Sequence, residues 1–494
     1  MNKIYRIHPK DNVAVALEAL RAGDSVDAGS GALVLRSHVP AGHKVALCDI
    51  PQGENVVKYG FPIGTASCGI AAGDWVHTHN TATRLGGKLE YRYEPDFRPL
   101  PPQKPAVFSG YRRKDGKVGI RNEVWIVPTV GCVNAIAQQI AEEARRALPS
   151  GVDGVYAFPH PYGCSQLSQD LLNTQLALCG LIRHPNAGGV LVLGLGCENN
   201  TMDEMKKILG PFDENRVKFL ICQEQEDEIA AGVGAVRELC AYAAGFRREP
   251  CGADELVVGL KCGGSDGFSG ITANPLVGSF SDRLVAQGGT AILTEVPEMF
   301  GAETLLMNRC KNESVFRQTV GLINNFKQYF MDHRQKIDSN PSPGNKAGGI
   351  TTLEDKSLGC VQKGGTAPVC GVLDYGMPVT EKGLNLLQGP GNDLVAATAL
   401  AVSGAHLVLF TTGRGTPFGC PVPTVKISSN SDLARRKKEW IDFNAGRLLT
   451  GENMPDLSDE FFRYVLDVAS GKKAAKSERF GEHGVAIFKN GVTL

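Results

Sequence analysis

Residues 124–134 read VWIVPTVGCVN, an apolar run of strand-forming residues that ends in a glycine-containing turn. Directly after it, Ile136, Ile140 and Ala144 recur at the spacing of one helix face. A strand followed at once by a helix is the repeating unit of proteins built on a parallel sheet. The stretch therefore predicts an α/β fold for the centre of the chain.

The alternation of apolar runs and helical patterns continues toward the C-terminal end, with an interruption at the polar junction RREPCGADE. We expect one α/β domain at 106–248 and a second at 249–494, where a mostly parallel sheet carries helices on both faces. Residues 338–363 show neither pattern and are expected to form a long loop. The runs that predict strands include GVYAFPH, GVLVLGLG, VKFLICQ, ELVVGLKC, TAILTEVPE, HLVLFTTGRG and TVKISSN.

The N-terminal part of the chain has a different pattern. Residues 1–90 contain short apolar runs separated by glycine-containing turns, which predicts a small, mostly β domain. Residues 91–105, YRYEPDFRPLPPQKP, contain five prolines and are expected to form a linker without regular structure.

Charge and hydropathy exclude several classes of protein. The 494 residues include 52 Lys and Arg against 52 Asp and Glu, so no overall field attracts nucleic acid or an anionic membrane. The longest apolar stretch, 394–410, is interrupted by Gly404 and His406, and the first residues lack the apolar core of a signal peptide. Fourteen cysteines then indicate free or functional thiols in a cytoplasmic protein.

The first candidate site is DWVHTHN at 74–80. Strand alternation would place His77 and His79 on the same face, where two imidazoles can hold a metal or act as acid and base. Two exposed histidines at the end of a strand are the alternative interpretation.

Acidic side chains form a second candidate site at strand ends of the last domain. Asp266, Glu295 and Glu298 follow apolar runs, and oxygen ligands there suit a divalent cation such as magnesium, manganous or ferrous ion. Ordinary loop acids are the alternative.

Two loops of the last domain carry basic residues that can bind an anionic ligand. Lys346 and Lys356 lie in NPSPGNKAGGITTLEDK, and Arg414 lies in TTGRGT and offers two parallel donors to a carboxylate. A solvated, flexible loop would have the same composition.

Cysteines provide a further hypothesis. Cys132, Cys164, Cys197 and Cys262 all lie where a predicted strand passes into a loop, so an iron–sulfur cluster is conceivable. Their wide spacing matches none of the compact cysteine motifs, and separate buried or edge thiols are the alternative.

Several long motifs occur in one order along the chain, and together they resemble the altronate/galactarate dehydratase family over nearly the full length. These motifs include GHKVALCDI, KYGFPIG, VHTHNT, GYRRKDGKVGIRNEVWIVPTVGCVN, YGCSQ, RHPNAGGVLVLGLGCENN, KCGGSDGFSGITANP, LTEVPEMFGAE, NPSPGNKAGGITTLEDKSLGC and AIFKNGVTL. One departure is the extra Cys420 after Arg414.

The resemblance implies a β-clip domain of the SAF type at the N-terminus, a middle α/β domain and a Rossmann-like C-terminal domain without a nucleotide. It implies a divalent metal, for which ferrous iron is the first candidate and manganese the second, and a sugar-acid substrate. D-altronate would lose water to give 2-dehydro-3-deoxy-D-gluconate, while galactarate or another sugar acid is the alternative substrate. A homo-oligomer, a dimer, is expected.

The expected mechanism removes the C2 proton of the substrate and expels the C3 hydroxyl. His77 and His79 are predicted as acid and base with Lys346 as a further base, and Asp266, Glu295 and Glu298 as the metal site. Two alternatives remain: an iron–sulfur hydro-lyase, and a non-enzymatic protein that binds a sugar acid or nucleotide. The residues predicted to bind substrate are Asn80, Lys356 and Arg414.

Overall fold

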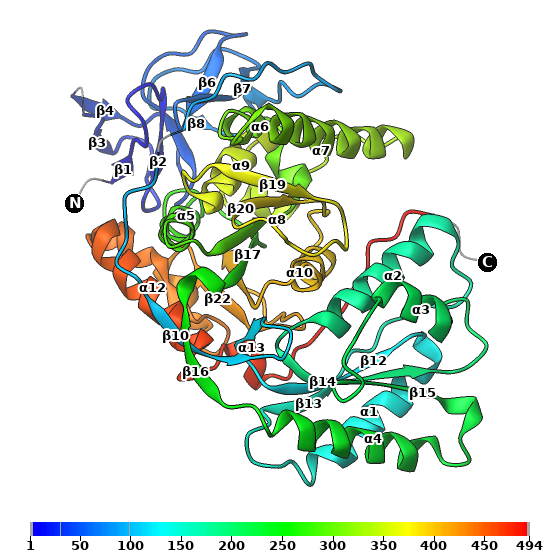
Figure 1. Ribbon diagram of the computed structural model, residues 1–494. Helices are drawn as coiled ribbons and strands as arrows, with labels where there is room; N and C mark the ends of the chain where they lie inside the picture. Colours follow the sequence, from blue (N-terminus) through cyan, green and yellow to red (C-terminus); the bar gives the residue numbers. More distant parts are fainter. Residues whose placement is uncertain (1–2, 30, 98, 492–494) are drawn as a thin grey trace.

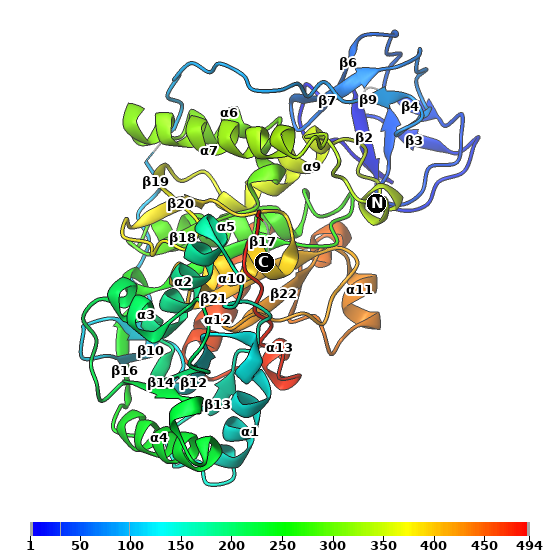
Figure 2. The same cartoon turned by 90° about the vertical axis from the view of Figure 1, so that its right-hand side faces the viewer.

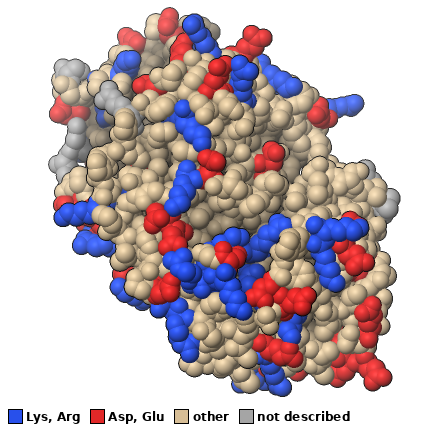
Figure 3. Space-filling model, viewed as in Figure 1, with Lys and Arg blue, Asp and Glu red and all other residues tan. Residues whose placement is uncertain are grey.

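The computed structural model describes residues 3–29, 31–97 and 99–491. Figure 1 shows three parts: the N-terminal strands at one end, a large parallel sheet in the centre, and a smaller α/β layer at the other end. On the face drawn in Figure 3, basic and acidic side chains are interspersed, as the zero net charge would suggest. None of the described helices is both long and apolar enough to cross a membrane.

The N-terminal part consists of short antiparallel strands, as the sequence predicts. One sheet has the order β1-β2-β5-β8 and another the order β6-β7-β9. Buried side chains such as Ile4, Val26 and Val45 form a small core of their own. The strands are β1 Ile4–Tyr5, β2 Val13–Ala16, β3 Ser25–Asp27, β4 Ala32–Val34, β5 Lys44–Ala46, β6 Asn55–Lys58, β7 Phe61–Ala66, β8 Trp75–Val76 and β9 Thr81–Ala82.

The middle part is a four-stranded parallel sheet of order β13-β12-β14-β15, so the predicted α/β domain is confirmed. Ile140 and Ala144 of α1 are buried against the sheet, as their spacing predicts. Helices α1 and α4 contact each other and one face, while α2 packs on the other. The elements are β12 Glu123–Pro128, α1 Asn134–Arg145, β13 Gly154–Ala157, α2 Ser168–Arg183, β14 Ala187–Gly194, α3 Met202–Leu209, β15 Val217–Ile221 and α4 Glu228–Ala243.

The C-terminal part is a seven-stranded parallel sheet of order β19-β20-β18-β17-β21-β22-β23, which confirms the second predicted sheet. Its strands are almost wholly buried because helices cover both faces. The elements are β17 Val257–Cys262, α5 Ala273–Val285, β18 Thr290–Leu293, α6 Glu303–Met307, α7 Glu313–Asp332, β19 Val369–Leu373, β20 Gly383–Leu387, α10 Asp393–Val402, β21 Leu407–Thr412, β22 Thr424–Ser428, α11 Ser431–Arg436, β23 Phe443–Asn444, α12 Met454–Ala469 and α13 Lys476–Arg479.

The long loop expected at 338–363 is wrong. The segment forms α8, Pro343–Ala347, and α9, Leu353–Cys360, followed by a 3-10 turn. The side chains of Ser342 and Thr352 cap these helices by accepting hydrogen bonds from backbone amides of the first turn, which would otherwise lack acceptors within the helix. Every residue of α9 is buried, so this segment belongs to the core of the site rather than to a flexible surface.

Two connections join the parts. A three-stranded antiparallel sheet pairs β10, Val107–Arg112, with β11, Val118–Gly119, and with β16, Arg248–Gly252, on the two sides of the middle domain. The described residues of 91–105 form no helix or strand and run along the C-terminal part, as Figure 2 shows beside α7. The Tyr93 hydroxyl, for example, donates to the carbonyl of Cys310 at 2.6 Å.

A buried ionic cluster holds the N-terminal part against α9. The Asp355 carboxylate accepts from Lys44 Nζ at 2.8 Å and from Lys58 Nζ at 3.0 Å, and all three side chains are at most 2% exposed. Lys44 also donates to the carbonyl of Gly349 at 2.7 Å. Burial alone would raise the pKa of Asp355, but the two ammonium groups outweigh burial and hold it well below its usual value.

We expect Asp355→Ala to lower the free energy of unfolding by about 3–5 kcal/mol, because it leaves two lysines buried without a counter-charge. Urea unfolding measures the change. The stabilisation from Asp355 is present above its unfolded pKa of about 4 and is lost as pH falls below it, so the variant should lose part of its acid sensitivity. Asp432→Asn, which removes an exposed pair with Arg435, should change stability by less than about 1 kcal/mol. Equal effects of the two substitutions would contradict the role given to the cluster.

Candidate active site and metal centre

A cavity of about 790 Å³ opens at the C-terminal edge of the seven-stranded sheet. Parallel sheets of this kind bind ligands at that edge, where loops from several strands meet. Its walls come from the ends of β17 and β18, from α7 and from the segment that holds α8 and α9. The polar and charged lining residues include Cys262, Glu298, His333, Asn340, Asn345, Lys356 and Asp393.

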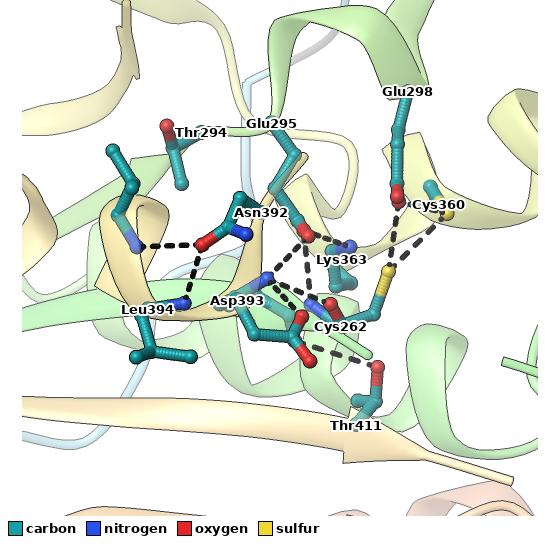
Figure 4. Close-up of polar contacts among 12 residues, drawn as sticks. Cys262, Thr294, Glu295, Glu298, Cys360, Lys363, Asn392, Asp393, Leu394 and Thr411 are labelled. Atoms are coloured by element: carbon teal, nitrogen blue, oxygen red, sulfur yellow. Dashed lines mark hydrogen bonds and ion pairs between the residues drawn. The ribbon is translucent and has the colours of Figure 1, made fainter. Parts of the chain in front are cut away.

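Two cysteines and one glutamate converge beside this cavity, as Figure 4 shows, and two of them, Cys262 and Glu298, line it. Cys262 ends β17, Glu298 lies in the 3-10 turn Val296–Met299, and Cys360 ends α9. The Cys262 sulfur lies 3.4 Å from that of Cys360 and 3.1 Å from Glu298 Oε2, and the Cys360 sulfur lies 3.2 Å from the same oxygen. In the described part of the chain, this is the only group of three such ligands within 4.8 Å of one another.

Lysines surround this group with positive charge. Lys356 Nζ lies 2.8 Å from Glu298 Oε1, and both side chains are less than a tenth exposed. Burial opposes ionisation of Glu298, but Lys356, Lys363 and Lys261 outweigh burial and hold its pKa at about 2. The hydrogen bond between the Cys360 and Cys262 sulfurs, followed by burial, raises the pKa of Cys360 well above its usual value.

The donor set fits a divalent transition metal. A thiolate pair with one carboxylate combines soft and hard ligands, which suits ferrous iron or zinc better than magnesium or calcium. The lysines favour anionic ligands in a site that is otherwise buried. Two sulfur ligands also favour iron over manganese.

Glu295 lies next to this group but is committed to other contacts. Its Oε1 accepts from Lys261 Nζ at 2.7 Å, and its Oε2 accepts from Lys363 Nζ at 3.1 Å and from the amide of Cys262 at 2.9 Å. Its backbone has φ 69°, a left-handed conformation that costs a non-glycine residue energy and that these contacts help to maintain. The structure therefore does not bring Glu295 into the ligand group.

Asp266 also lies outside the ligand group. Its carboxylate accepts from the hydroxyls of Ser269 and Ser429 and from Asn430 Nδ2, all within 3.0 Å. These bonds fix the loop after β17 to the loop after β22. Of the three predicted carboxylate ligands, Glu298 alone joins the group, and two thiols take the remaining places.

The predicted basic residues are distributed around the cavity. Lys356 lines it and also donates to Asn340 Oδ1 at 3.0 Å. Arg414 is exposed, and its amide donates to the carbonyl of Gly264, a lining residue. Lys346 is exposed on α8 and does not belong to the described lining.

The predicted histidine pair lies at the contact between the N-terminal part and the 349–356 segment. The strand ends at Val76, so the expected strand alternation through His79 is wrong. Both histidine rings contact the Trp75 ring, with ring centroids 5.4 Å apart for His77 and 5.0 Å apart for His79. His79 is exposed, whereas buried His77 has its Nδ1 3.0 Å from the Thr351 hydroxyl. Burial, followed by the charge of Lys44, lowers the pKa of His77 to about 4, so its ring is neutral near pH 7.

Asn80 holds the turn that carries these histidines. Its Oδ1 accepts from the amide of His77 at 2.9 Å, and its Nδ2 donates to the carbonyl of Trp75 at 2.9 Å. The side chain is therefore engaged in the turn. Neither histidine nor Asn80 belongs to the described lining of the cavity.

Two residues of the site were not identified from the sequence. Cys360 lies in the segment expected to be a loop, so its position at a helix end beside the sheet was not foreseen. Asp393 begins α10, lines the cavity and accepts from Lys261 Nζ at 2.9 Å. The signal for Asp393 was Asn392, a helix N-cap residue placed directly before a long apolar helical pattern.

Family models match the chain in three consecutive segments. They are the altronate/galactarate dehydratase SAF domain at 2–84, the D-galactarate dehydratase/altronate hydrolase second domain at 110–244, and the D-galactarate/altronate dehydratase C-terminal domain at 253–493.

Full-length relatives agree with these models. The chain is 55% identical over 492 residues to an altronate dehydratase of Escherichia coli (strain K12), covering 99% of each chain. It is 52% identical over 498 residues to an altronate dehydratase of Bacillus subtilis (strain 168), covering 100% of each, and 35% identical to a galactarate dehydratase (L-threo-forming) of Escherichia coli (strain K12), covering 98% of this chain and 96% of that one. With its β-strand, middle α/β and C-terminal parallel-sheet parts matched in order, the chain belongs to the altronate/galactarate dehydratase family.

Proposed function

We propose that this protein is a hydro-lyase that dehydrates D-altronate to 2-dehydro-3-deoxy-D-gluconate, with a divalent metal held by Cys262, Glu298 and Cys360. The observation that carries the proposal is the buried Cys/Glu/Cys group, of which Cys262 and Glu298 line the cavity. Support for the substrate comes from the two relatives above 50% identity, both of which are altronate dehydratases. The 35% relative makes galactarate the second candidate substrate.

The reaction must remove a weakly acidic proton from C2, next to the carboxylate, and expel the hydroxyl from C3. When bound, a divalent metal would supply electrophilic stabilisation of the negative charge that develops on the substrate carboxylate. Lys356 faces the cavity from beside Glu298 and adds a fixed positive charge there. Burial opposes that charge, but Glu298 outweighs burial and raises the pKa of Lys356, so the residue binds a carboxylate rather than giving up a proton.

Asp393 is the group proposed to move the proton. Its carboxylate is 37% exposed and lines the cavity, while Lys261 fixes one of its oxygens. It accepts the C2 proton and delivers it to the departing C3 oxygen, so that water leaves and an enol remains. The enol then becomes the 2-keto acid by taking a proton at C3 and losing one from its hydroxyl.

His77 then has a positioning role. Its contact with Thr351 lies one residue before the N-cap of α9, the helix that carries Lys356 and Cys360. This differs from the acid–base role that the sequence predicts for His77 and His79. Arg414, at the edge of the loop beside Gly264, is proposed to bind a substrate oxygen at the mouth of the cavity.

Metal removal and a substrate panel test the proposed function. We expect exhaustive chelation to lower the rate of altronate dehydration by at least about 100-fold, because the electrophilic term is worth several kcal/mol. Ferrous ion should restore the rate more fully than manganous ion. The 2-keto-3-deoxy product is measured with altronate, galactarate and other sugar acids under anaerobic, reducing conditions. Full activity in metal-free protein would contradict the metal, and no turnover of any sugar acid would contradict the reaction.

A further inference from the structure

The loops that follow three neighbouring strands of the middle sheet each carry an exposed cysteine. Cys132 follows β12, Cys164 follows β13 and Cys197 follows β14. Because β12 lies between β13 and β14 in a parallel sheet, the three loops leave the sheet at the same edge. Cys262, the fourth cysteine singled out in the sequence, belongs to the other sheet and to the site described above.

Hydrogen bonds join each of these loops to the other two. The amide of Gly131 donates to the carbonyl of Tyr162 at 2.9 Å, and the amide of Asn200 donates to the carbonyl of Gly163 at 3.1 Å. Asn200 Nδ2 donates to the carbonyl of Thr129 at 2.9 Å. Since these bonds lie one to three residues from the cysteines, the three thiols are carried by one fixed backbone framework.

Gly163 is required for this close approach. Its φ is +99°, in the left-handed region, and a β-carbon at this position would come within 2.0 Å of the carbonyl oxygen of Thr129. The loops are therefore built to lie against each other at the cysteine-bearing edge.

The edge also carries the starts of two helices and one buried polar atom without a partner. Helices α1 and α2 begin just after the loops of Cys132 and Cys164, and neither has a side chain capping its first amides. Those amides favour a negatively charged ligand. The side chain of Asn200 is fully buried among the three loops, and its Oδ1 has no hydrogen-bond partner within the described residues.

The spacing of the sulfurs argues against a single metal ion. Two sulfurs bound to one ion at about 2.3 Å can lie no more than about 4.6 Å apart. Throughout residues 3–29, 31–97 and 99–491, the three loop cysteines form no group within 4.8 Å. A cuboidal iron–sulfur cluster bonds each thiolate to a different iron and so needs wider spacing.

We infer that Cys132, Cys164 and Cys197 bind a [4Fe–4S] cluster at the edge of the middle sheet, with the fourth iron free of any protein ligand. This site is separate from the metal of the proposed function. Cys222 follows β15 at the same edge, but its side chain packs in the core and burial raises the pKa of its thiol to about 11, so it does not serve as the fourth ligand. The free iron would take an oxygen ligand such as the carboxylate or hydroxyl of a small molecule.

The test uses the full chain, purified anaerobically and then incubated with iron salts and sulfide. We expect about four iron atoms and about four acid-labile sulfides per chain above the metal of the other site, with visible absorption typical of a cluster. Each of the substitutions Cys132→Ser, Cys164→Ser and Cys197→Ser should lower the labile sulfide several-fold. Three controls should keep it: Cys48→Ser and Cys68→Ser, which change exposed cysteines elsewhere, and Cys222→Ser, which changes the buried one.

A second measurement tests the free iron. Ferricyanide should accept one electron from each [4Fe–4S]²⁺ cluster, which then releases one Fe²⁺ and leaves [3Fe–4S]⁺, detected by its electron paramagnetic resonance signal. Retention of all four irons, or loss of the cluster in Cys222→Ser, would show a fourth protein ligand and overturn the free position.

Absence of labile sulfide, or its full retention when all three cysteines are replaced together, overturns the cluster, as does binding of zinc or iron without sulfide. Cys360→Ser separates this result from the proposed function, since it should remove the other metal and leave the sulfide unchanged.

Discussion

Glu298→Gln should lower kcat for altronate dehydration by at least about 10³-fold and should abolish metal binding. The substitution removes the only carboxylate of the ligand group, and each 1.4 kcal/mol of lost electrophilic stabilisation costs a factor of ten. Metal content by elemental analysis and product formation in the same samples measure the two effects. A variant that keeps wild-type metal content would contradict the assigned site.

Glu298→Gln also leaves Lys356 without its counter-charge, which can cost about 3–5 kcal/mol of stability. Cys360→Ser provides a second test because it removes one thiolate and keeps the buried pair of Glu298 and Lys356. It should lose metal and activity while unfolding at nearly the wild-type urea concentration. Cys310→Ser, a buried cysteine outside the group, should keep both metal and activity.

Asp393→Asn should lower kcat by about 10²–10⁴-fold, the usual effect of losing a positioned acid or base, with little change in metal content. The substitution is nearly isosteric, and Lys261 keeps its ion pair with Glu295, so the fold should persist. Steady-state kinetics at saturating altronate measure kcat, and elemental analysis of the same samples measures the metal content.

The double substitution His77→Ala/His79→Ala distinguishes the histidine pair from Asp393 as the acid–base group. If these residues only position α9, kcat should fall by less than about tenfold, while Asp393→Asn shows the large loss. The reverse result, with a loss above about 10² in the folded, metal-loaded histidine variant, would return the acid–base role to the N-terminal part and contradict the role given to Asp393.

Most of the fold could be predicted because most strands and helices are marked by the pattern of their own neighbouring residues. The run VWIVPTV and the spacing of Ile140 and Ala144 require only neighbouring residues to be interpreted. The prediction of a loop at 338–363 was wrong for the opposite reason. The two helices of this segment are short and polar and are stabilised by caps and by burial against other parts of the chain, so no apolar periodicity marks them.

The site was harder to predict because it depends on contacts between distant segments. The predicted strand ends placed Glu298 and Cys262 among the candidate residues, yet whether a carboxylate binds metal or lysine depends on which charges lie opposite. Glu295 contacts Lys261 and Lys363, and Asp266 contacts Ser429 and Asn430, all of which lie at least 34 residues away in the sequence. Cys360 comes from 98 residues beyond Cys262, a pairing that only the tertiary structure reveals.

The ionic contact of Asp355 with the N-terminal part also sets an order of events during synthesis. Lys44 and its carboxylate partner are separated by 311 residues. At about 5–20 residues per second, the ribosome needs roughly 15–60 s to supply that partner after Lys44 has been made. Through this interval Lys44 and Lys58 remain in water, and the N-terminal strands must fold with these two basic side chains exposed. The newborn chain therefore acquires its final domain arrangement only after most of it has left the ribosome.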